Sequence, residues 1–284
     1  MAAPRRVGVI GLGKMGGPIS GRIAAAGHEV FGFDVDASAR AQAARHGVVV
    51  LDSVRAVAEA SEGTIVLVGS EQAAADICLD DVDGLLIPGK AIVICSTVSA
   101  DLVHQVAQRA ATVGADVLDA PLARGEGAAR AGTLLVLAAG ARAVFKRWED
   151  VLSAFGSDVA FLGAAGAGQI AKTINNYLLW ASVVATAEGM RLAQAHGIDF
   201  DALIEALLTS SGESYALRTW QLARDMPWAE KDMQIAVQSF SAAGVKAPLA
   251  GVVEGTIAAL KAEKNGWQGE RVDISMDEFI RHSG

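Results

Sequence analysis

Short apolar runs alternate with longer, helix-like segments in this chain as far as Gly163. The runs are rich in Val and Ile and are bounded by turn residues, which is typical of buried strands. Strands that alternate with helices predict βαβ units and a parallel sheet covered on both faces. The predicted strands are 7–10, 29–33, 64–68, 91–95, 116–118, 134–138 and 159–162. The predicted helices between them are 16–26, 37–46, 53–60, 71–79, 100–111 and 141–155.

The pattern changes after Gly163, where no further strand is predicted. Residues 169–196 form one long helical pattern that is apolar on most sides, which indicates burial. Shorter helices follow, separated by Gly and Pro residues that favour turns. They are predicted at 199–208, 215–224, 230–243 and 248–263. The sequence therefore predicts an α/β domain at residues 1–164 and an all-helical domain at residues 165–284.

Composition narrows the possible classes of protein. A length of 284 residues suggests roughly two domains, and an apolar content of 52% lets each of them bury a core. The net charge of -8 argues against nucleic acid or an anionic membrane surface as the main partner. Cys78 and Cys95 have the spacing of neither a disulfide framework nor a metal site. No run reaches the ~18–20 apolar residues of a membrane span. From these features we expect a cytoplasmic protein, and from the cysteine spacing we expect no metal.

A glycine-rich turn follows the first predicted strand. Gly11, Gly13 and Gly16 have dinucleotide-binding spacing, with a strand before them and a helix after them. In that motif the glycines allow the tight turn, the approach of pyrophosphate to the backbone, and close helix packing. Asp34 ends the second predicted strand, where a carboxylate can accept from both ribose hydroxyls and repels a 2′-phosphate. We predict that NAD is favoured over NADP, with a plain turn residue as the alternative for Asp34.

The loop after predicted strand 116–118 carries a second candidate site. It lies at the carboxyl end of a strand, where open α/β sheets bind ligands. Arg124 in this loop could pair with a substrate carboxylate through two parallel N–H bonds. The alternative is a solvated loop arginine.

The long predicted helix begins with the motif Gly166-x-Gly168-x-x-x-Lys172-x-x-Asn175-Asn176. Lys172 and Asn176 lie four residues apart, so both polar groups can reach the same small space. A lysine with a lowered pKa can accept or return a proton, and an asparagine can orient a substrate hydroxyl. Lys172 could instead be a snorkelling lysine. Asn175 and Asn176 argue against this, because they add polar groups that need partners at an apolar helix start.

Together these motifs resemble the β-hydroxyacid dehydrogenase family, the group of 3-hydroxyisobutyrate dehydrogenase and tartronate semialdehyde reductase. Residues 11–19 match the amino-terminal signature, and residues 119–134 match the substrate loop in outline. The catalytic signature G-x-G-x-x-x-K-x-x-N-N is matched in full by residues 166–176. Lys231 and Asp232 resemble the late lysine–aspartate motif. Four motifs in the right order are far more specific than any one alone.

The resemblance implies a Rossmann domain, an all-helical domain built on a long interdomain helix, and a site in the cleft between them. Lys172 corresponds to the catalytic lysine and Asn176 to the substrate-orienting asparagine. The residues expected to bind substrate are Ala123, Arg124, Gly125 and Asn175. The residues expected to bind the cofactor are Gly11, Leu12, Gly13, Met15, Gly16, Asp34, Ser96, Thr97 and Lys231. The resemblance also implies a homodimer or homotetramer that assembles through the helical domains.

One position departs from the family's pattern. The usual Ser-Gly-Gly loop holds the substrate carboxylate with backbone amides and a serine hydroxyl, whereas this chain has Ala123, Arg124 and Gly125. Some branches, including sulfolactaldehyde reductases, carry an arginine near this position for an anionic group. We therefore expect a rebuilt anion pocket, which argues against hydroxyisobutyrate itself as the substrate.

These features predict an NAD(P)-dependent dehydrogenase of a small β-hydroxy acid or a related anionic alcohol, with Lys172 as the acid–base group. An imine reductase is one alternative, although enzymes of that kind generally lack the lysine. A non-catalytic nucleotide-binding protein is another, and retention of Lys172, Asn176 and Lys231 disfavours it. An S-adenosylmethionine methyltransferase would share the glycine-rich turn but would leave the lysine–asparagine pair unexplained.

Overall fold

The computed structural model describes residues 3–80, 82, 84–220, 226 and 228–266 of the chain. The chain forms two compact units, Met1–Lys172 and Thr173–Gly284. The division falls inside the long helix α8 (Ala167–Ala195), which was predicted at residues 169–196. The domain boundary predicted at residue 164 lies just before this helix, and its place stays a prediction.

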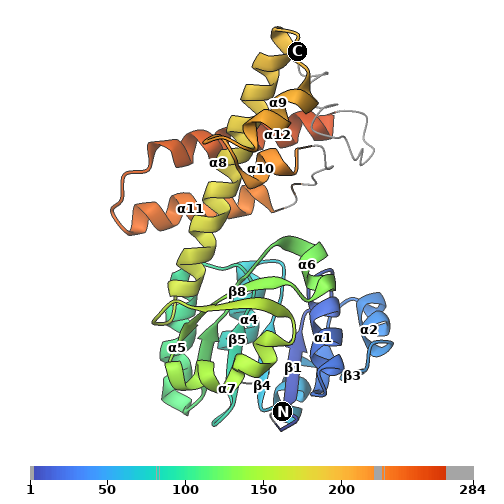
Figure 1. Ribbon diagram of the computed structural model, residues 1–284. Coiled ribbons are helices and arrows are strands. Elements are labelled where there is room, and N and C mark those ends of the chain that lie inside the picture. Colours follow the sequence, from blue (N-terminus) through green and yellow to red (C-terminus); the bar gives the residue numbers. More distant parts are fainter. Residues whose placement is uncertain (1–2, 81, 83, 221–225, 227, 267–284) are drawn as a thin grey trace. The chain divides into compact units, whose positions relative to one another are not determined.

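The first unit contains a nine-stranded sheet (Figure 1). Its strands are β1 (Arg6–Ile10), β2 (Glu29–Phe33), β3 (Val48–Val50), β4 (Gly63–Val66), β5 (Ala91–Ile94), β6 (Asp116–Asp119), β7 (Leu122–Ala123), β8 (Leu134–Gly140) and β9 (Gly156–Phe161). The strand order is β3-β2-β1-β4-β5-β6-β8-β7, and β9 pairs with β8. The first six strands in this order are parallel; five of them were predicted, and β3 was not.

The far edge of the sheet differs from the predicted parallel arrangement. Strand β8 runs antiparallel to both β6 and β7, and β9 follows the direction of β8. The physical reason is the connection: the chain turns back through the short helix α6 (Gly125–Ala131), which is not a βαβ crossover returning to the starting end of the sheet.

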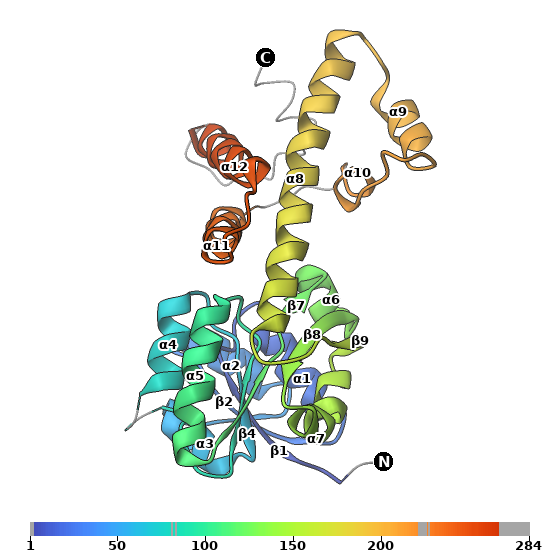
Figure 2. The ribbon, with the colours of Figure 1, turned by 90° about the vertical axis from the view of Figure 1, so that its left-hand side faces the viewer.

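Helices cover both faces of this sheet (Figure 2). On one face, α1 (Gly16–Ala25), α2 (Ala37–Ala44), α6 and α7 (Arg142–Ser153) supply side chains such as Ile19, Ile23 and Trp148 to a continuous apolar core. On the other face, α3 (Val54–Ala60), α4 (Glu71–Leu79) and α5 (Ala100–Val113) supply Cys78 and Val106, among others.

The register of the parallel strands collects four chain segments at one edge of the sheet. Ile10 pairs with Val66, Val66 with Ile94, and Ile94 with Asp119. These four residues end β1, β4, β5 and β6 in one row across the sheet. The residues that follow them therefore meet at the carboxyl edge, where open α/β sheets bind ligands.

The described residues of the second unit form helices joined by turns and loops, with no strand among them (Figures 1 and 2). It contains most of α8 together with α9 (Phe200–Leu207), α10 (Tyr215–Arg218), α11 (Ala229–Ala242) and α12 (Pro248–Gly266). Its core joins side chains of all five helices, including Trp180, Met190, Ile204, Met233 and Ile257. The helix predicted at 215–224 extends into residues that lie outside the described ones. Among the described helices, none has the length and hydropathy that a membrane crossing requires.

Candidate active site

The glycine-rich turn between β1 and α1 owes its shape to close backbone contacts. Gly11 has a φ of +91°, and a Cβ there would lie 2.2 Å from the Leu67 carbonyl oxygen. A Cβ on Gly16 would lie 1.8 Å from the Gly11 carbonyl oxygen. A Cβ on Gly13, in contrast, would have no heavy atom within 4 Å. The outer two glycines are thus required by the fold, and the middle one leaves open backbone that fits an approaching phosphate.

Asp34 stabilises this turn through hydrogen bonds to its carboxylate. Its Oδ2 accepts a hydrogen bond of 2.6 Å from the Leu12 amide, and its Oδ1 accepts one of 2.8 Å from the Asp36 amide. Each carboxylate oxygen has a second acceptor direction, so a role in the turn is compatible with a role in ribose binding. Arg40 lies beside it, because its guanidinium donates to the Asp34 and Val35 carbonyls at 2.5 and 3.2 Å. A cation therefore stands close to the carboxylate that we expect to select the cofactor.

Ser96 joins the ends of β4 and β5. It is 4% exposed, and its Oγ accepts from the Val68 amide at 2.8 Å and donates to the Val66 carbonyl at 3.2 Å. The next residue, Thr97, is half-buried. The predicted cofactor residues Ser96 and Thr97 thus belong to a segment whose backbone is fixed from the neighbouring strand.

Asp119, at the end of β6, holds the beginning of α8. It is fully buried, and its two carboxylate oxygens accept from the Gly166 amide at 3.1 Å and the Gln169 amide at 3.0 Å. Burial raises the pKa of this carboxyl to about 6, against the opposing effect of the amide hydrogen bonds. The sequence placed Asp119 only in the outline of a substrate loop and did not predict this role.

Gln169 makes a second link between α8 and the sheet. Its side chain is 1% exposed. Nε2 donates to the Ser96 carbonyl at 2.9 Å, and Oε1 accepts from the Val98 amide at 3.2 Å. The amino end of α8 is therefore fixed to the ends of both β5 and β6.

The predicted catalytic residues follow directly along α8. Lys172 is half-buried and lies three residues after Gln169. The Asn175 side-chain amide donates to Asn176 Oδ1 at 3.0 Å, and Asn176 is 3% exposed. Helical geometry puts Lys172 and Asn176 on one face of α8, as expected from their spacing. Their catalytic roles stay predictions.

The substrate loop has an unusual backbone at Arg124. Ala123 ends β7, and Arg124 has a φ of 85° immediately before Gly125 at 74°. The guanidinium of Arg124 donates from one nitrogen to the Thr133 carbonyl at 3.0 Å, Ser157 Oγ at 3.1 Å and Asp158 Oδ2 at 2.5 Å. The hydrogen bond from Arg124 is the largest of the effects that lower the pKa of the exposed Asp158 carboxyl.

Ser157 and Asp158 are partners that sequence reasoning missed. They reach Arg124 through the pairing of β9 with β8, and no local motif signals that pairing. A guanidinium held in this way keeps its charge at the carboxyl end of β7.

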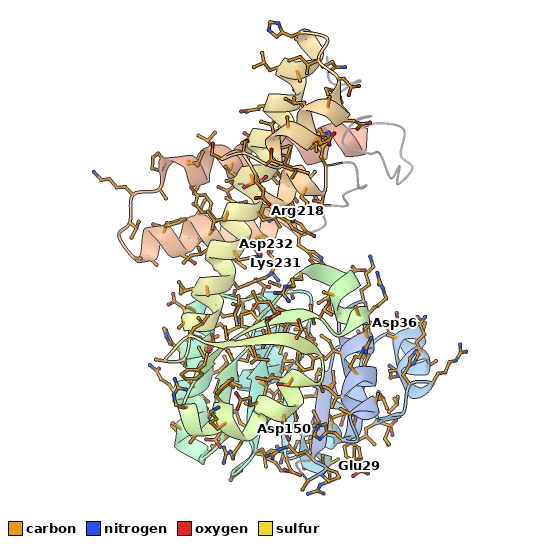
Figure 3. The ribbon with its side chains drawn as sticks, viewed as in Figure 1. Glu29, Asp36, Asp150, Arg218, Lys231 and Asp232 are labelled. Atoms are coloured by element: carbon orange, nitrogen blue, oxygen red, sulfur yellow. The ribbon has the colours of Figure 1, made fainter. Side chains whose placement is uncertain are left out.

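Lys231 and Asp232 lie in the first turn of α11, in the second unit (Figure 3). Asp232 is 8% exposed, and its Oδ2 accepts a hydrogen bond of 3.1 Å from the Trp180 indole nitrogen. This contact fixes the start of α11 against α8 within the helical unit. The predicted site residues thus divide between the units, with Asn175, Asn176 and Lys231 in the second.

Across the described residues, no three His, Cys, Asp or Glu side chains gather as metal ligands would. Cys78 and Cys95 are buried free thiols. Burial and the neighbouring Asp119 charge raise the pKa of the Cys95 thiol, so it does not offer a thiolate.

Comparison with known proteins agrees with these motifs. Residues 6–163 match the family model of the NAD-binding domain of 6-phosphogluconate dehydrogenase. Residues 166–272 match the model described as the NAD-binding domain of NADP-dependent 3-hydroxyisobutyrate dehydrogenase. The chain is 36% identical to a 3-hydroxyisobutyrate dehydrogenase of Pseudomonas aeruginosa over 78% of this chain and 74% of that protein. It is 32% identical to an NAD-dependent L-serine dehydrogenase of the same organism over 79% and 74% of the two chains.

A solved structure is similar over nearly the full length. A Mycobacterium tuberculosis 3-hydroxyisobutyrate dehydrogenase with L-serine superposes with a TM-score of 0.85 at 28% identity. The match covers 98% of this chain and 99% of that one.

We predict that Asp119 makes stability depend on pH. The folded-state pKa of about 6 lies above the ordinary value of 3.8, so the folded protein binds a proton more tightly than the unfolded chain. The contribution of Asp119 to the free energy of unfolding should therefore fall as pH rises from about 4 to about 7, by on the order of 2–3 kcal/mol. Denaturant unfolding gives the free energy of unfolding of wild type and of Asp119→Asn at each pH. The difference between the two proteins should change by this amount across the range. A difference that stays constant with pH would contradict the prediction.

Proposed function

Because this chain belongs to the β-hydroxyacid dehydrogenase family, we propose that it transfers hydride between a nicotinamide cofactor and a small β-hydroxy acid or related anionic alcohol. The relatives support the coarser description of an NAD(P)-dependent hydroxyacid dehydrogenase. The observation that carries the finer proposal is the attachment of α8. Asp119 and Gln169 fix this helix at the carboxyl edge of the sheet, next to Ser96 and one turn before Lys172.

In this proposal Lys172 moves the proton of the reaction. The bound nicotinamide supplies the hydride acceptor or donor. In the oxidative direction the Nζ of Lys172 accepts the proton of the substrate hydroxyl as the carbinol carbon loses hydride. In the reductive direction Nζ returns that proton to the forming hydroxyl. Asn176 orients the hydroxyl, and proton transfer by a positioned group contributes roughly 10²–10⁴-fold.

The substrate's anionic group is assigned to the loop Ala123, Arg124 and Gly125. The Arg124 guanidinium is partly exposed, and its contacts with Asp158 and Ser157 orient it from β9. A planar guanidinium has five donors, so donors remain for a carboxylate or a sulfonate. This loop lacks the serine hydroxyl of the family's usual pattern, which supports a substrate with a differently placed anion.

We also propose that a second copy of the chain covers part of the helical unit. Large apolar side chains are exposed on α8 and α12 in this unit. They include Leu178, Leu192, Leu249 and Val252. Contiguous apolar patches mark protein interfaces, so these side chains are the candidates for the contact in a homodimer or homotetramer.

We predict that Lys172→Ala lowers kcat by at least ~10²-fold while NADH binding stays near that of wild type. A panel of serine, glycerate, threonate, hydroxyisobutyrate and sulfonate analogues with NAD identifies the substrate for this measurement. NADH fluorescence titration measures cofactor binding. The control is Lys146→Ala, because Lys146 is an exposed residue of α7 paired with Glu149. Near wild-type turnover by Lys172→Ala would refute the mechanism, and an inactive wild type that still binds NADH would favour a non-catalytic protein.

We predict that Arg124→Ala lowers kcat/KM by roughly 30-fold or more. Losing one partner of a charge-assisted pair in a closed site costs on the order of 2–5 kcal/mol. Arg124→Gly should lose a similar factor while relieving the positive φ, which separates the charge from the backbone strain. Arg55→Ala is the matched control, since Arg55 is a surface residue of α3 paired with Glu59. A loss of kcat/KM below about threefold in both Arg124 variants would contradict this role and would assign anion binding to the backbone amides around Gly125.

We predict a higher kcat/KM with NAD than with NADP. The Asp34 carboxylate would repel a 2′-phosphate, whereas the neighbouring Arg40 guanidinium would attract it. Arg40→Ala should therefore reduce the use of NADP further and change the use of NAD by less than about threefold. Steady-state kinetics with both cofactors measure this. A wild type that prefers NADP would show that Asp34 does not face the ribose.

A further inference from the structure

The side chain of Gln169 is a buried polar group whose hydrogen-bonding role the family assignment leaves open. A buried amide must be satisfied at both ends, and here the two ends bond to the backbone on either side of Thr97. The orientation of the amide is determined by these partners. A flipped amide would face the Ser96 carbonyl with its oxygen and the Val98 N–H with its NH₂ group, which satisfies neither.

The first turn of α8 has little freedom to move. Asp119 accepts from the amides of Gly166 and Gln169. A Cβ on Gly168 would lie 2.3 Å from the Leu137 carbonyl oxygen and 2.7 Å from Asp119 Oδ2, so the helix backbone presses on β8 and β6. Gln169 adds two side-chain hydrogen bonds between α8 and the segment after β5.

Gln169 therefore connects two groups that the reaction must align. The peptide around Thr97 is expected beside the nicotinamide, and Lys172 lies one turn along α8. Positions three apart are neighbours on a helix surface. Acid–base chemistry is sensitive to such placement, because a displacement of about 1 Å can cost on the order of 10²-fold in rate.

We propose, on the basis of the function proposed for Lys172, that Gln169 is a positioning residue: its amide sets the distance and angle between Lys172 and the Ser96–Val98 segment. It touches neither substrate nor cofactor in this role. It acts through Lys172 and through the backbone around Thr97.

The first experiment replaces Gln169 by Leu, which has a similar size and makes no hydrogen bond. Gln169→Leu should lower kcat by roughly 10–100-fold and change the NADH dissociation constant by less than about threefold. In a Lys172→Ala background the same substitution should change the residual rate by less than about threefold, because the group that it positions is already gone. Gln72→Leu is the control, since Gln72 is an exposed residue of α4 bonded to Asp76.

The second experiment uses Gln169→Glu. A neutral glutamic acid has one donor and one acceptor and reproduces the amide, whereas an ionised one turns a charge toward the Ser96 carbonyl. The ratio of its kcat to that of wild type should therefore rise by about tenfold or more as pH falls from 8 to 6. The ratio for Gln169→Leu should stay flat over this range, because Leu has no proton to gain. Titratable or charged groups on the elements packed around this turn are Cys95, Asp119, His104, Glu71 and Lys172.

A third measurement requires no turnover. Hydrogen exchange of the apoprotein should become at least about tenfold faster for the Val98 amide and the first turn of α8 in Gln169→Leu.

The outcomes separate the two proposals: an active wild type with an inactive Lys172→Ala supports the proposed function. Against that background, a kcat change below threefold in Gln169→Leu, an equal loss in the Lys172→Ala background, or a flat pH ratio for Gln169→Glu would overturn the role of Gln169. A wild type without dehydrogenase activity would overturn both.

Discussion

The buried carboxylate of Asp119 is the contact on which the candidate site depends. No solvent reaches it, so its charge must be stabilised by the two amides at the start of α8 and by the positive end of that helix. These contacts offset only part of the cost of burial, as the pKa of about 6 shows. The helix must therefore begin at this point of the sheet edge, and the place of Lys172 follows from that beginning.

Backbone contact is the second constraint, and it explains why glycines recur at this edge. Gly11 and Gly16 lie so close to carbonyl oxygens that a methyl group would overlap them, and Gly168 presses in the same way on β8. The carboxyl edge is thus built from backbone packed on backbone. Gly13 is the exception, because a Cβ there would meet no heavy atom within 4 Å, and its open side leaves room for an anion beside the backbone. The same edge can then carry both the nucleotide turn and the attachment of α8.

The sequence predicted the parts of the fold that local patterns encode. Val and Ile runs predicted the six parallel strands apart from β3, whose three residues are too few to form a pattern. The reversal through α6 and the direction of β8 depend on pairing across the sheet edge, which no local period records. Within the site, Gly11 and Lys172 were found from motif spacing. Gln169 was missed because it occupies an unspecified position of its motif, and its importance comes from two partners on another strand.

Arg124 combines both kinds of constraint. Among the described residues it is the only non-glycine residue with a positive φ, a conformation that costs an L-residue roughly 1–2 kcal/mol. A glycine at this position would carry no such strain and would need no partner on β9. The chain instead holds the side chain with Thr133, Ser157 and Asp158. A strained backbone conformation persists only where the surrounding structure holds it, and such residues cluster at functional sites. At the carboxyl end of β7, beside Gly125, the strained residue supplies a fixed positive charge. This is the physical basis for expecting that the substrate of this chain is selected by the position of its anion.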